Sequence, residues 1–166
     1  DPEDRAEIRR ARDHGLKGRI LVVDAYTPEP DQDSGSLRLV YLMQCFRDLG
    51  YGVTFMPDNR AWAGDYSRAL QRIGIEVAFD PWISSLQRFL AERGEEFDFV
   101  MVSRHYVASK YLGPVRRHCP HARFIFDTVD LHYLRERRQA EFERSTALKL
   151  AARQTRRAEL AVIRAA

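Results

Sequence analysis

The chain has only two cysteines, Cys45 and Cys119, and neither belongs to a CxxC pair or to another spacing typical of metal ligands. Two cysteines cannot form the dense disulfide framework of a small secreted domain. The simplest prediction from the cysteine content is therefore a protein of a reducing, cytoplasmic compartment.

Long apolar runs are also missing, because none approaches the roughly 20 residues needed to cross a bilayer. The opening stretch, Asp1 to Lys17, is charged and lacks the apolar centre of a secretory signal peptide. With 45% hydrophobic and 31% charged residues, the 166-residue chain has the size and composition of one soluble globular domain.

Lysine is scarce, since 24 of the 27 basic residues are arginine, a bias that we attribute mainly to the base composition of the gene. The net charge of +3 is unevenly spread: residues 135–166 carry +5 and the rest of the chain carries −2. Nucleic-acid-binding surfaces interleave basic residues with aromatic ones, and this basic segment has almost no aromatic residues. We therefore expect no nucleic-acid partner.

What the sequence does contain is a regular alternation of strand-like and helical segments. Arg19–Asp24 is a β-branched run typical of a strand that is buried on both faces. The further strands are expected at 53–56, 75–79, 97–102 and 122–126, with helices at 36–49, 66–73, 82–92 and 108–118 and one long helix from 133 to the end. This rhythm predicts an α/β domain with a Rossmann-like parallel sheet and helices on both faces.

The domain organisation follows from the same pattern. Residues 1–18 are expected to be a linker or helical tail from a preceding region, and residues 19–166 to form the Rossmann-like domain. Because the chain stops inside a helical pattern without a glycine or proline stop, we expect the domain to be truncated before its last strand.

Ligands of parallel α/β sheets bind outside the carboxyl ends of the strands, so the segment after the first strand is a candidate. It runs from Asp24 into a helix through Asp33, Ser34, Gly35 and Ser36, and it contains several competent helix N-caps. Such an N-terminus suits a phosphate or a sugar hydroxyl, and the acidic residues nearby favour the hydroxyl. A well-capped helix behind a rigid loop explains the same residues. A single glycine is not the G-x-G-x-x-G dinucleotide fingerprint.

Polar residues also follow the fourth and fifth strands. Arg104 and His105 come after the fourth strand, and Asp130, His132 and Arg135 come after the fifth. An imidazole at a strand end can act as a base or a hydrogen-bond donor, and an aspartate beside it can fix its tautomer. A structural histidine and a solvated helix start with Asp130 as its N-cap remain the alternative.

These motifs together resemble the N-terminal domain of retaining GT-B glycosyltransferases of the family-four type, which are bacterial enzymes of polysaccharide, O-antigen and cell-wall assembly. The resemblance extends over about 19–166. It rests on the proline-containing loop, the turn Ser34–Ser36, Arg38, the apolar helix that ends before Gly50, and Asp127, Asp130, His132 and Arg135 after the fifth strand.

The resemblance implies transfer of a sugar from a nucleotide-sugar to a hydroxyl acceptor, a glycan or a lipid-linked molecule. This chain would be the acceptor-side half, inactive by itself, and a C-terminal domain absent from the chain would hold most of the donor. No metal and no cofactor are implied, and the location is cytoplasmic, with peripheral contact to the inner membrane face.

Site roles are implied in the same way. Ser34, Gly35 and Ser36 would approach the donor sugar or phosphate, and Arg38 would brace their loop. His105, Asp130 and His132 would be the catalytic residues that contact hydroxyls. Arg104 and Arg135 would meet anionic groups of the substrates.

Two other classes of protein stay open. A phospho-receiver domain shares the first strand and the size, with Asp80 as the only candidate phosphate acceptor, but it needs an acidic pair after the first strand and a lysine after the fifth. A non-catalytic interaction module would use the basic C-terminal helix to pack on a partner or on an anionic membrane.

Overall fold

The computed structural model describes residues 7–8, 11–129 and 131–166. Its strands pair in parallel throughout one sheet. The strands are β1 (Arg19–Asp24), β2 (Gly52–Pro57), β3 (Glu76–Val77), β4 (Phe99–Ser103) and β5 (Arg123–Asp127). The helices are α2 (Ser34–Asp48), α3 (Asp65–Arg72), α4 (Leu86–Arg93), α5 (His105–His118), α6 (His132–Phe142) and α7 (Thr146–Ala165), with a 3-10 turn, Gly94–Glu96, after α4.

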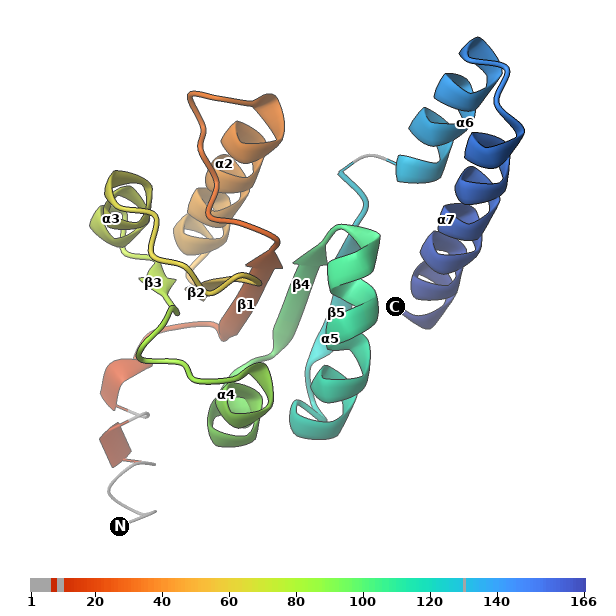
Figure 1. The fold of residues 1–166 in the computed structure, drawn as a ribbon. Helices are drawn as coiled ribbons and strands as arrows, with labels where there is room; N and C mark the ends of the chain where they lie inside the picture. Colours follow the sequence, from red (N-terminus) through yellow and green to blue (C-terminus); the bar gives the residue numbers. More distant parts are fainter. Residues whose placement is uncertain (1–6, 9–10, 130) are drawn as a thin grey trace.

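The central strand β1 is buried along its whole length and separates two apolar cores. Because side chains alternate along a strand, Leu21 and Val23 enter one core while Ile20 and Val22 enter the other. Helices α2 and α3 cover one face of the sheet, and α4 and α5 cover the opposite face (Figure 1). The predicted α/β fold, a Rossmann-like parallel sheet with helices on both faces, is confirmed.

The strand order is β3-β2-β1-β4-β5. Strands β2 and β3 are added in turn on one side of β1, and the chain then crosses over so that β4 pairs with the other side of β1. The direction of winding therefore reverses between β1 and β4, and ligands of open α/β sheets bind at the carboxyl ends beside such a reversal. The carboxyl ends of β1, β4 and β5 form the edge that we name the carboxyl rim.

The prediction of one long helix from residue 133 to the end is wrong, because the chain forms two packed helices, α6 and α7. The backbone turns at Arg144, which has a φ of +50°, and the Ser145 hydroxyl then accepts a hydrogen bond from the Leu148 N–H at 3.3 Å. A serine in this position ends one helix and begins the next. The resulting hairpin projects from the sheet, and α7 returns toward α5 (Figure 1).

Smaller differences concern other boundaries. The third strand pairs over two residues only, not over 75–79. Helix α4 begins at Leu86 instead of Trp82, because the Ser85 hydroxyl caps it by accepting from the Arg88 N–H at 3.2 Å. Helix α5 begins at His105, three residues earlier than expected. No helix among the described residues is both long and apolar enough to cross a membrane.

Candidate functional site at the carboxyl rim

At the reversal point, an ion pair joins the ends of β1 and β4. The Nε of Arg104 donates to Oδ1 of Asp24 at 2.6 Å, and the same oxygen accepts from the Ala25 N–H. Arg104 has a φ of +66°, a backbone conformation that costs energy in a residue with a side chain. The structure therefore holds Arg104 at the rim by an ion pair, with its side chain 39% exposed.

The loop after β1 is organised by Asp33, which is the N-cap of α2. Its two carboxylate oxygens accept from the N–H and the hydroxyl of Ser36, at 2.8 and 2.6 Å. These hydrogen bonds, chiefly that of the Ser36 hydroxyl, lower the pKa of Asp33, and the positive charge of Arg104 contributes. Both hydrogen-bond donors of Ser36, its N–H and its hydroxyl, are therefore directed to Asp33. Ser34, in contrast, is exposed to solvent.

Gly35 brings this loop against the segment that follows β5. A Cβ added at Gly35 would lie 3.7 Å from Cγ1 of Val129 and 3.1 Å from Oδ1 of Asp33. Arg38 makes a second connection, since its guanidinium donates two hydrogen bonds to Asp127, at 2.7 and 3.0 Å. Arg38 therefore fastens α2 to the end of β5.

The two predicted histidines lie side by side. His105 begins α5 and His132 begins α6, and their ring centroids are 5.1 Å apart in an edge-to-face arrangement. Each side chain is 15% exposed, but the Nδ1 atom of each is buried. The ends of β4 and β5 thus deliver both imidazoles to one place.

Glu159 of α7 lies between these histidines and was not predicted as a site residue. Its side chain is 1% exposed, and its Oε1 lies 3.3 Å from Nδ1 of His105 and 3.4 Å from Nδ1 of His132. Its two oxygens also accept from the N–H groups of His132 and Tyr133, at 2.8 and 3.2 Å. Glu159 therefore supplies from another helix the N-terminal cap that α6 lacks within its own sequence.

A sequence signal for Glu159 existed in the spacing of α7. The buried residues of this helix are Ala152, Glu159 and Val162, which are separated by seven and three positions. That spacing places all three on one face of a helix. A charged residue on a buried face needs a partner, and the two histidines are that partner.

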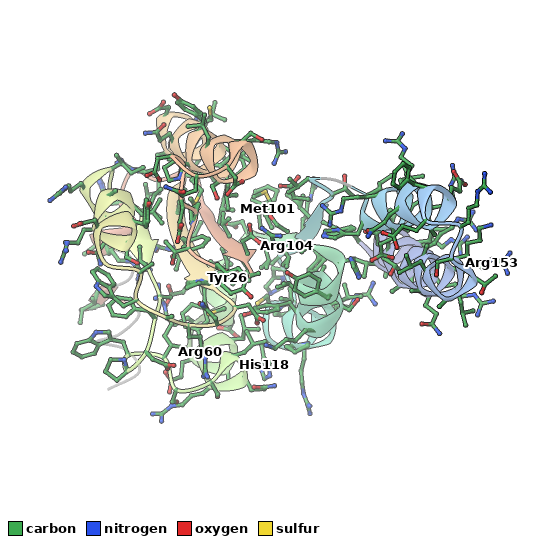
Figure 2. All side chains as sticks on the ribbon, turned by 45° about the horizontal axis from the view of Figure 1, so that its top comes forward. Tyr26, Arg60, Met101, Arg104, His118 and Arg153 are labelled. Atoms are coloured by element: carbon green, nitrogen blue, oxygen red, sulfur yellow. The ribbon has the colours of Figure 1, made fainter. Side chains whose placement is uncertain are left out.

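The remaining predicted residues are placed as follows. Arg135 is exposed on α6, one turn after His132. Asp130 lies outside the described residues. Figure 2 brings the upper side of the Figure 1 view forward and shows Tyr26 and Arg104 near the middle of the molecule, whereas Arg153 of α7 lies at the right-hand edge of the view.

A cavity of about 580 Å³ lies elsewhere, beside β3, and is lined in part by Trp82, Phe89 and Arg88. Strand β3 forms the sheet edge opposite β5, so this cavity is distant from the histidine pair. It contains none of the predicted site residues. The chemistry-bearing residues of the carboxyl rim therefore give the stronger candidate site.

Comparisons of this chain with protein-family models, with curated proteins and with solved structures found no match.

Proposed function

We propose that this chain is the acceptor-side domain of a GT-B glycosyltransferase, which transfers a sugar from a nucleotide-sugar to a hydroxyl acceptor in polysaccharide or cell-surface glycan synthesis. The observation that carries the proposal is the pairing of His105 and His132 at the carboxyl rim of a parallel sheet. An imidazole nitrogen binds a hydroxyl group as a donor or as an acceptor according to its tautomer, which suits a polyhydroxylated substrate.

In the proposed reaction the acceptor hydroxyl oxygen forms a bond to the anomeric carbon, and the bond from that carbon to the nucleotide diphosphate breaks. The proton of the acceptor hydroxyl passes to the leaving diphosphate. His105 and His132 orient sugar hydroxyls at the reacting centre. The N-terminus of α2, at Ser34 and Gly35, lies near the donor sugar, where its N–H groups bind sugar hydroxyls. Arg104 and Arg135 add positive charge near anionic groups of the substrates, and a C-terminal domain supplies the rest of the donor pocket.

The reaction so described needs no metal ion or organic cofactor for the bond-breaking step, because the diphosphate is stabilised by helix N–H groups and cations. We place the enzyme in the cytoplasm, in keeping with two unpaired cysteines, Cys45 and Cys119. The basic outer surface of α6 and α7 would lie near an anionic membrane if the acceptor is lipid-linked.

The test is sugar transfer by the enzyme in which this domain is joined to its donor-binding half. We expect His132→Ala and His105→Ala each to lower kcat/KM by about 100-fold or more, the usual effect of removing a group that assists proton transfer or orientation. His121→Ala is the matched control, because His121 is exposed and precedes β5 at the opposite end of the sheet.

Thermal unfolding of each variant must stay near that of the parent, so that a loss of transfer reflects chemistry. Transfer rates of His105→Ala and His132→Ala within a factor of two of the His121→Ala rate would overturn the proposal.

A further inference from the structure

We propose that His105, His132 and Glu159 together bind one divalent transition-metal ion, with Zn²⁺ as the first probe. One ligand atom from each residue lies within 4.8 Å of the other two. Imidazole nitrogen and carboxylate oxygen are a common ligand set for zinc, and three protein ligands with one open position are typical of zinc sites that also bind an exogenous group. This inference goes beyond the proposed sugar transfer, which needs no metal.

Two of the three distances between ligand atoms, those from Glu159 to each histidine, match the spacing of two ligands on one zinc ion. Zinc binds nitrogen and oxygen at about 2.0–2.2 Å in tetrahedral geometry, so two ligand atoms of one ion lie about 3.4 Å apart. The Oε1 of Glu159 lies 3.3 Å from one Nδ1 and 3.4 Å from the other. The ligands come from three helices, α5, α6 and α7, whose packing holds these positions before an ion arrives.

The environment of Nδ1 of His105 also favours a bound cation. Its Nδ1 is buried and makes no hydrogen bond within the described part of the chain, although it faces a carboxylate. A lone pair on this nitrogen would face the lone pairs of Glu159, which is unfavourable in a buried place. Oε1 accepts one hydrogen bond, from the His132 N–H, and retains a second lone pair. A metal ion between Nδ1 and Oε1 uses both lone pairs.

A metal on Nδ1 fixes the tautomer of each imidazole. The remaining proton then sits on Nε2, so both rings become donors on the side away from Glu159. If the proposed function holds, these N–H groups are the ones that contact sugar hydroxyls. The metal would then position the imidazoles and take no part in bond breaking.

The test is titration of the chelator-treated 166-residue chain with Zn²⁺ by calorimetry, and with Co²⁺ by visible absorption. We expect one ion per chain with an affinity in the micromolar range or tighter, and an absorption band typical of four-coordinate Co²⁺. His105→Ala and His132→Ala should each weaken Zn²⁺ binding by at least about 100-fold, since even loss of a residue that only supports a ligand costs 10- to 100-fold. His121→Ala should bind as the parent does.

Glu159 also caps α6, so a Glu159 variant could lose metal through a local structural change. The histidine variants are therefore the ones that decide the test. No binding of Zn²⁺ or Co²⁺ by the folded parent chain overturns the proposal, as does binding that survives both histidine substitutions. If a proton, and not a metal ion, lies between Glu159 and an imidazole, the folded parent chain will bind neither Zn²⁺ nor Co²⁺. The two proposals fail separately: intact Zn²⁺ binding without sugar transfer removes the proposed function alone, and transfer by a chain that binds no metal removes the metal site alone.

Discussion

The sheet domain and the α6–α7 hairpin are stabilised in different ways. In the sheet domain, every residue of β1 is buried and two apolar cores fill the space beneath the helices. In the hairpin, the described buried residues are Ala140, Ala152, Glu159 and Val162, whereas Phe142 is 90% exposed. Apolar burial thus dominates the sheet domain, whereas the hairpin buries three apolar side chains and the carboxylate of Glu159.

The difference matters because the candidate site lies where the two regions meet. Val162 reaches the core on the α5 face, and Nη2 of Arg116 donates to the backbone oxygen of Ala165 at 2.6 Å. Glu159 makes the third connection, through both histidines and the start of α6. A residue at this seam can therefore affect both the docking of the hairpin and the geometry of the site.

The largest effect is expected in the apolar cores. Phe55 is fully buried on β2, and Phe55→Ala should lower the free energy of unfolding by about 3–5 kcal/mol. Tyr41→Ala, at a 60% exposed position on α2, is the control and should change it little. Chemical denaturation measures both variants. Equal losses for the two would contradict the assignment of the core.

Glu159→Ala should act mainly on the hairpin. It removes the acceptor of two backbone donors, at His132 and Tyr133, and an unsatisfied buried donor costs about 1–3 kcal/mol. Hydrogen exchange should therefore speed up in α6 and α7 while β1 stays protected. Glu143→Ala, at an exposed hairpin position, is the control. Unchanged exchange in α6 would show that Glu159 does not hold the hairpin.

A smaller effect is expected at the α2 cap. Asp33→Ala should lower the free energy of unfolding by about 1 kcal/mol, as is usual for an N-cap. The hydrogen bonds from Ser36 lower the pKa of Asp33, so its contribution is present above the ordinary aspartate pKa and is lost as the pH falls through the lowered value. Denaturation at neutral and at strongly acidic pH gives the difference in free energy of unfolding between parent and variant, and this difference should shrink in acid. A difference that grows in acid would contradict the assignment.

The smallest effect belongs to the exposed tip of the hairpin. Phe142→Ser should change the free energy of unfolding by no more than about 0.5 kcal/mol, because the side chain has little contact to lose. A loss of more than about 2 kcal/mol, far outside that surface range, would mean that Phe142 is covered in solution, and the contrast between the two regions would need revision.

The sequence predicted the sheet domain better than the hairpin, for physical reasons. The apolar run at β1 and the caps before α2 are local signals. β1 lies where expected, and Asp33 is one of several competent N-caps in its segment, although α2 begins at Ser34, before the expected start at residue 36. The turn at Arg144 depends on a left-handed residue that is not glycine, which local patterns do not predict. Likewise, Glu159 acquires its role from residues 26 and more positions away.

The site was foreseen in the same uneven manner. The rule that ligands bind at the carboxyl ends of strands correctly placed Arg104 and His105 beside that edge, and the structure brings His105 and His132 together. The strand-end rule does not apply to Glu159, because Glu159 is on a helix. Nor does the rule indicate that Ser36 directs both of its donors to Asp33.

The central claim is that His105 and His132 act as one unit on the substrate. A double-mutant cycle of sugar transfer, with His105→Ala, His132→Ala and the combined variant, tests it most directly. If the claim is right, the combined variant loses little more activity than the worse single variant, because either substitution already disables the unit. If the two losses in kcat/KM multiply, the histidines act independently and the claim is wrong.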